Sequence, residues 1–139
     1  MSNGQLVEEL NKALSWELRA IALYAHYSAY VSGIHRLHLS AHFNNEANES
    51  LMHAATVRSA IVKLGGEATT ERNPHPIVHT TDYVEMLRQA YETEVMAGKV
   101  YGEILETLKN HNDDELYDAI ESIYFAELRS VEEVRMLLN

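Results

Sequence analysis

Acidic and imidazole side chains recur along faces of this sequence that are otherwise apolar. Residues 44–53 read NNEANESLMH. In a helix Glu46, Glu49 and His53 share one face, because each residue turns an α-helix by about 100°. Carboxylate oxygens combined with imidazole suit iron or manganese. Protons or a hydrogen-bonded network could also satisfy such groups, so the pattern leaves both a metal site and a polar network open.

Three further apolar stripes at helical spacing each carry one glutamate near the midpoint: Glu17, Glu94 and Glu127. The stripes are Leu6, Leu10, Ala13, Leu14, Glu17, Ile21, Tyr24, Ser28; Tyr83, Leu87, Ala90, Glu94, Gly98, Tyr101, Leu105, Leu108; and Leu116, Ile120, Ile123, Glu127, Val131, Val134, Leu138. Apolar residues at this spacing mark the buried face of a helix. Each glutamate is therefore expected inside the protein, where a carboxylate needs compensation.

Helices of similar length that pack side by side bring their midpoints to one level. Burying several carboxylates together is prohibitive unless protons or cations compensate them, and a cation compensates all of them at once. We therefore predict a metal site within the bundle, with ligands Glu17, Glu49, His53, Glu94 and Glu127. Glu46 lies two turns from His53, about 10 Å along the axis, which assigns it to a second or inner site.

The elements that position these residues are four periodic segments, at about 3–32, 36–64, 82–110 and 113–138. Short breaks separate the first pair (VSGIH, 31–35) and the last pair (KNHNDDE, 109–115), and the segment GGEATTERNPHPIVHTTD joins the two pairs. No stretch alternates with period two, so strands are not expected. The pattern predicts one all-α domain over residues 1–139, a four-helix bundle of two antiparallel hairpins joined by a long crossover.

Composition limits the classes of function. The 139 residues carry a formal net charge of −10, which disfavours nucleic acid as a partner and attracts cations. Without cysteine there are no disulfides and no cysteine-ligated metal sites, as is typical of a reducing cytoplasm. No apolar run approaches the roughly 20 residues of a membrane span, and residues 1–14 do not read as a signal peptide. We expect a cytoplasmic protein with no membrane partner.

The chain resembles the ferritin-like superfamily, and within it bacterioferritin and the related Dps branch. The resemblance rests on LNKALSWELRAIALYAHY, NEANESLMHAATVRSAIVKLGG, ETEVMAGKVYGEIL and YFAELRSVEEVRMLL, which look like the four helices of that family. It implies metal ligands at Glu17, His53, Glu94 and Glu127, with Tyr24 nearby. Tyr24 and Tyr101 are expected either to hydrogen-bond the ligand carboxylates or simply to pack.

The chain departs from the family pattern at its paired ligands. Ser50 stands three residues before His53, where the family has glutamate, and Ser130 stands three after Glu127, where the family has histidine. The position of the family's haem-ligating methionine is Leu51, which counts against haem. His35, His38 and His42 extend the polar stripe toward one end of the second helix, either as solvated side chains or as an accessory metal path.

The resemblance implies an iron-binding protein in which Glu17, Glu94 and Glu127 support oxidation of Fe(II) by O₂ or peroxide. One or two irons are expected, with manganese or zinc as alternatives. Storage or detoxification of iron would require a homo-oligomer, either a dimer or a cage. The serines leave open a non-catalytic scaffold with a degenerate metal site and an external binding role. A di-iron oxygenase or peroxidase acting on an organic substrate would need a pocket that the sequence does not reveal.

Overall fold

The computed structural model describes residues 3–139, which form four long α-helices and no strand. They are α1 (Gly4–Tyr30), α2 (Arg36–Lys63), α3 (Tyr83–Leu108) and α4 (Asp114–Leu138). The sequence segments match these helices in order, and their ends differ by no more than two residues. The prediction of an all-α four-helix bundle is confirmed.

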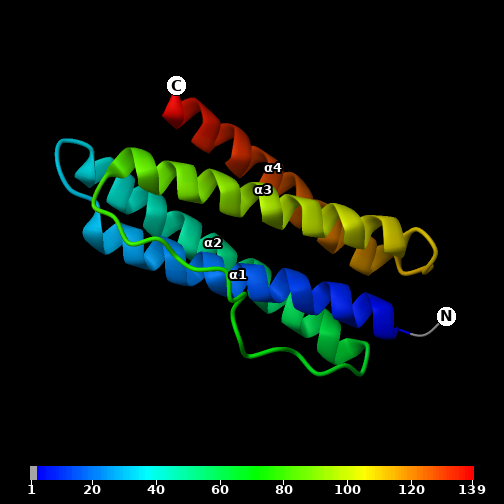
Figure 1. The fold of residues 1–139 in the computed structure, drawn as a ribbon. Coiled ribbons are helices and arrows are strands. Elements are labelled where there is room, and N and C mark those ends of the chain that lie inside the picture. Colours follow the sequence, from blue (N-terminus) through cyan, green and yellow to red (C-terminus); the bar gives the residue numbers. More distant parts are fainter. Residues whose placement is uncertain (1–2) are drawn as a thin grey trace.

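The helices form two antiparallel hairpins, α1 with α2 and α3 with α4 (Figure 1). The long crossover returns along the bundle, so that α3 starts at the end where α1 finishes, as predicted (Figure 1). The closest helix packing is within each hairpin, α1 also packs against α3, and α2 touches α4 at few points. The interior between α2 and α4 is therefore the least tightly closed side of the bundle.

Side chains and one glycine define the helix ends. The carboxylate of Asp82 accepts a hydrogen bond from the backbone N–H of Val84, and that of Asp113 accepts one from Leu116. Each satisfies a donor that the first turn of a helix leaves unpaired. At the end of α2, Gly65 has φ of 81°, the left-handed conformation that glycine adopts without steric cost and that commonly terminates helices.

The crossover lies along α1, held by side chains of that helix (Figure 1). Asn11 bonds both Glu67 and Thr69, and the Tyr27 hydroxyl donates to the carbonyl of Val78. Between them, the guanidinium of Arg19 donates to the carbonyls of His75 and Pro76 and to the Thr93 hydroxyl. These bonds replace the water that a loop backbone would otherwise require.

Replacing Arg19 should loosen this attachment. Arg19 is only 1% exposed, so Arg19→Met leaves two carbonyls and a hydroxyl without their donor. We expect a loss of about 2–4 kcal/mol in the free energy of unfolding. Urea unfolding and limited proteolysis of residues 66–82 would measure it, with Arg88→Met, at an exposed arginine, as control. Equal effects of the two substitutions would contradict the assigned role.

The apolar core consists of two clusters of buried residues. One gathers the first half of α1, the second half of α2, the second half of α3 and the first half of α4, including Leu10, Leu14, Val57, Ile61, Ile104, Leu105 and Ile120. The other gathers the opposite halves, including Leu23, Tyr27, Leu39, Phe43, Met86, Leu87 and Val134. The glutamates predicted to meet at mid-height fall between the two clusters.

Among residues 3–139, no helix is both long enough and apolar enough to cross a membrane.

Candidate metal centre

Each helix contributes an acidic or imidazole side chain to the middle of the bundle. Glu17 of α1, Glu94 of α3 and Glu127 of α4 are 1%, 4% and 3% exposed, and His53 of α2 is half-buried beside them. Full burial of even one glutamate is unusual unless it is paired. The helical period placed these residues on the buried faces, and the packing of the four helices brings them to one level.

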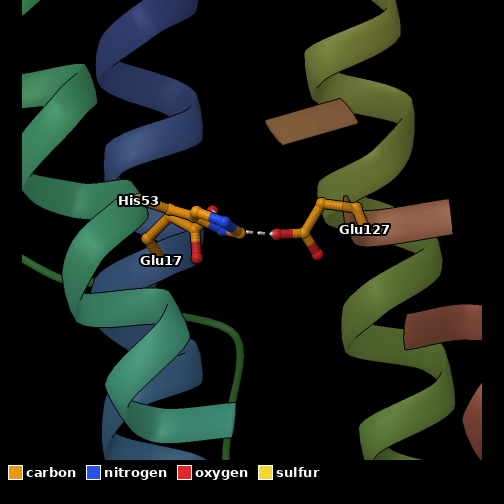
Figure 2. A group of neighbouring side chains, drawn as sticks. All are labelled: Glu17, His53 and Glu127. Carbon is orange, nitrogen blue, oxygen red and sulfur yellow. Dashed lines mark hydrogen bonds and ion pairs between the residues drawn. The ribbon is translucent and has the colours of Figure 1, made fainter. Parts of the chain in front are cut away.

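Three of these side chains converge on a small volume. The Nδ1 atom of His53 lies 3.1 Å from Oε1 of Glu127 and 3.3 Å from Oε2 of Glu17. One ligand atom from each of the three residues lies within 4.8 Å of the other two. Figure 2 shows Glu17 and His53 reaching from α1 and α2 toward Glu127 of α4. A cation with ligand bonds of about 2.0–2.2 Å fits this spacing, because its neighbouring ligand atoms lie about 3 Å apart.

Two buried tyrosines orient the carboxylates across the bundle. The Tyr24 hydroxyl of α1 donates a 2.6 Å hydrogen bond to Glu94 of α3, and the Tyr101 hydroxyl of α3 donates a 2.6 Å bond to Glu17 of α1. Burial and the adjacent glutamates raise the pKa of both tyrosines well above 10, so they remain neutral donors. Each carboxylate thus keeps one oxygen held by a tyrosine and its orientation fixed.

Burial and mutual repulsion set the protonation of the centre. Desolvation and the charge of Glu127 raise the pKa of Glu94 well above its usual value. Desolvation, followed by the charge of Glu17, does the same for Glu127, and outweighs a hydrogen bond with Glu94 that favours the ionised form. Burial lowers the pKa of His53, but its hydrogen bond to Glu17 and the surrounding carboxylates raise it by more. Without a cation, this centre retains protons that a bound cation would displace.

The predicted ligands Glu46 and Glu49 do not join the three converging side chains. Glu46 and Glu49 of α2 are half-buried, and neither belongs to the group of converging ligand atoms. Desolvation, then the charges of Glu94 and Glu49, raise the pKa of Glu46 to about 7, while the Ser130 hydroxyl is near enough to lower it. Ser50 and Ser130 are both buried, at the positions that differ from the family pattern. Sequence reasoning did not anticipate that Tyr24 bonds Glu94 and Tyr101 bonds Glu17, since the members of each pair lie on different helices.

The histidines toward the start of α2 form no compact metal cluster with the centre. His38 is exposed, and the His35 and His38 rings meet edge to face with centroids 5.3 Å apart. His42 is half-buried and burial lowers its pKa. Among residues 3–139, the only group of three potential ligands that meets in space is Glu17, His53 and Glu127. That these histidines are solvated side chains, or that they form an accessory path for metal, both stay predictions.

Comparison with known proteins identifies the family that has this architecture. A family model for the ferritin-like domain matches residues 7–139, nearly the whole chain. The chain belongs to the ferritin-like family. This confirms the resemblance seen in the sequence.

Solved structures of ferritin-like proteins show how close the similarity is. A ferritin-like, diiron-carboxylate protein from Bacillus anthracis str. Ames is 35% identical, with a TM-score of 0.94 and complete coverage of both chains. A dodecameric thioferritin from Bacteroides fragilis, described as bacterioferritin-related, is 25% identical, with a TM-score of 0.90 over 99% of this chain and 86% of that one. The comparison with curated proteins finds no match.

Proposed function

We propose that this ferritin-like protein binds Fe(II) within its bundle and promotes its oxidation by O₂ or peroxide. The observation that carries the proposal is the convergence of Glu17, His53 and Glu127 in a polar layer between two apolar clusters. Mixed carboxylate and imidazole ligands suit iron, with manganese and zinc as competing occupants. The diiron-carboxylate description of the Bacillus anthracis protein supports iron as the substrate.

The chain's own residues have distinct roles in this proposal. His53 supplies a neutral nitrogen donor, and Glu17 and Glu127 supply oxygen donors that neutralise the charge of the cation. Tyr101 holds Glu17, and Tyr24 holds Glu94, so that the ligand oxygens are oriented before the cation arrives. Glu94 and Glu127 give up their protons when the cation binds, which keeps the buried charge compensated. The iron supplies the electron that the oxidant takes up.

The hollow beside Glu94 favours a small oxidant over a bulky organic substrate. A hollow of about 230 Å³ between α3 and α4 includes Glu94, Gly98, Gly102 and Leu128 in its lining. Pockets for drug-sized ligands occupy roughly 300–1,000 Å³. O₂ or peroxide fits this hollow. The volume of the hollow is smaller than the pocket that a di-iron oxygenase would need for a sizeable organic substrate.

We propose further that the protein assembles as a homo-oligomer in the cytoplasm and stores or detoxifies the oxidised iron. The dodecameric state of the Bacteroides fragilis protein supports assembly. Exposed apolar side chains at Leu37, Leu51, Met52 and Val62 of α2 offer a surface for a second copy. Light scattering after size-exclusion chromatography would distinguish a cage from a dimer. A monomer at micromolar concentration would contradict the storage role.

Rapid Fe(II) oxidation by the purified protein is the expected result that tests the function. The ferric product is followed by its near-ultraviolet absorbance. His53→Ala should slow the oxidation by at least about tenfold, because mutating even a hydrogen-bond partner of a metal ligand typically costs 10–100-fold in activity. His79→Ala, which removes an exposed crossover histidine, is the matched control. A folded protein that neither binds nor oxidises iron would support the alternative of a non-catalytic scaffold, which the serines at positions 50 and 130 favour.

A further inference from the structure

Two histidines on the outside of the bundle face each other through their ring nitrogens. The Nε2 atom of His26, on α1, lies 2.9 Å from the Nδ1 atom of His79, in the crossover. The two residues are 53 positions apart in the sequence, so the pair exists only because the crossover folds back along α1. Neither side chain has a part in the function proposed above.

The histidine pair is separate from the metal centre inside the bundle. His26 follows Glu17 by nine residues on α1, which corresponds to about 13 Å along the helix axis and about two and a half turns. The half turn places His26 on the face of α1 opposite to Glu17. His26 is half-buried and His79 is exposed, whereas Glu17 is 1% exposed. A cation held by the pair would therefore be a different one from that of the centre, and in contact with solvent.

The neighbouring residues hold the two imidazoles in position. Tyr27 follows His26 and is fully buried, and its hydroxyl donates a 2.7 Å hydrogen bond to the carbonyl of Val78. That carbonyl belongs to the residue immediately before His79. The ring of Tyr30 packs against both imidazoles, with its centroid 4.6 Å from that of His26 and 4.7 Å from that of His79. Because both rings are placed before a ligand arrives, less conformational entropy is lost on binding.

The distance between the two nitrogens suits a pair of ligands on one cation. Metal–nitrogen bonds of about 2.0–2.1 Å place their nitrogens about 2.9 Å apart when the bonds meet at about 90°. Neighbouring ligands meet at that angle in the square-planar and tetragonal geometries of Cu²⁺ and Ni²⁺. Without metal, one ring donates a hydrogen bond to the other. The cation takes the place of that proton once the donating ring shifts to its other neutral tautomer, with no net loss of protons.

We propose that His26 and His79 form a surface site for a divalent transition-metal ion, Cu²⁺ or Ni²⁺, with water in its remaining positions. The bound cation cross-links the crossover to α1. The affinity of nitrogen ligands for divalent metals rises from iron to nickel and copper, so of these three metals Fe(II) binds this pair least tightly. The site therefore goes beyond the iron chemistry of the centre, and substitutions at His79 should leave Fe(II) oxidation there unchanged.

Electron paramagnetic resonance of bound Cu²⁺ tests the site, because coupling to coordinated nitrogens reports how many of them bind the metal. The host is the His53→Gln protein, in which the three converging residues of the centre no longer include an imidazole. Two equivalents of Cu²⁺ are added, so that the carboxylates of the centre cannot take up all of the metal. We expect coupling to two nitrogens. In this host, His26→Gln or His79→Gln should leave coupling to at most one nitrogen. Each should also lower the Cu²⁺ affinity measured by calorimetry by at least about tenfold, since even disturbing a ligand's hydrogen-bond partner changes affinity by that much.

Two further variants in the same host sharpen the test. His38→Gln removes an exposed histidine whose ring meets that of His35 with centroids 5.3 Å apart, and it should change neither the nitrogen coupling nor the affinity. Tyr27→Phe keeps both ligands and removes only the hydrogen bond to Val78. It should weaken Cu²⁺ binding severalfold and leave the coupling to two nitrogens. Circular dichroism establishes that each variant is folded.

The outcomes separate this site from the function of the centre. Coupling to one nitrogen or to none in the His53→Gln host would overturn the inference. Coupling to two nitrogens that survives His26→Gln would also overturn it, because other histidines would then bind the metal. Neither result bears on the proposed function, whose test follows Fe(II) oxidation and its dependence on His53.

Discussion

Replacing Glu127 by glutamine should abolish Fe(II) oxidation and at the same time stabilise the metal-free protein. Glu127 is 3% exposed, and its Oε1 lies 3.1 Å from Nδ1 of His53, within the group of converging ligand atoms. Removing its charge should cost more than the 10–100-fold typical of a ligand's hydrogen-bond partner. We expect oxidation to fall by at least about a hundredfold.

The gain in stability has the same physical origin. Desolvation raises the pKa of Glu127 well above its usual value, which means that ionising this buried carboxyl costs free energy in the folded protein. Glutamine has nearly the same shape and no charge to desolvate. The free energy of unfolding of the metal-free variant should therefore increase by about 1–3 kcal/mol near neutral pH.

Urea unfolding in the presence of a chelator and an Fe(II) oxidation assay measure the two effects. Glu115→Gln, at an exposed glutamate of α4, is the matched control and should change neither quantity. A Glu127→Gln variant that is less stable than the unaltered metal-free protein would show that the carboxylate is a structural hydrogen-bonding group. An active variant would show that the metal binds elsewhere.

Without metal, the protein should lose stability as the pH rises. Burial raises the pKa of Glu46 from 4.5 to about 7, and the pKa values of Glu94, Glu127 and His53 are also raised. The folded protein therefore binds protons that the unfolded chain has released, and unfolding releases them. The contribution of such a group to the free energy of unfolding is fully present below its pKa in the unfolded chain. It disappears as the pH rises through its pKa in the folded protein.

The pH range over which stability is lost follows from these raised pKa values. The Glu46 contribution is complete below pH 4.5 and is lost as the pH passes through about 7, and the raised pKa values of Glu94 and Glu127 act in the same direction. Glu46 alone should account for about 1–2 kcal/mol, a value reduced for its partial exposure to solvent. A bound cation reverses the trend, because it requires the deprotonated carboxylates.

Unfolding measured at a series of pH values, with chelator and with Mn²⁺ or Zn²⁺, checks this expectation. With chelator, the free energy of unfolding should fall between about pH 5 and pH 8, and with metal it should rise or stay level. Glu46→Gln should flatten the chelator curve below pH 7, since glutamine does not titrate. A chelator curve that rises with pH would contradict the proposed burial of protonated carboxyls.

The fold could be predicted from the sequence because the patterns that specify each helix are local. Apolar residues at helical spacing identified all four helices, and the breaks at 31–35, 65–82 and 109–115 separated them. The positions of Glu17, Glu94 and Glu127 near the midpoints of their stripes also followed from periodicity, because helices of similar length align at mid-height. The buried face and the approximate height of each acid thus followed from sequence spacing.

Tertiary structure decided which side chains contact one another. Tyr24 bonds Glu94 and Tyr101 bonds Glu17, across the bundle rather than along one helix. Glu46 and Glu49, both predicted as ligands, lie outside the group of converging ligand atoms. Spacing along one helix fixes the face and the height of a residue, but the rotation and offset of a neighbouring helix determine its partner. Those quantities depend on packing of the whole bundle, which no local pattern encodes.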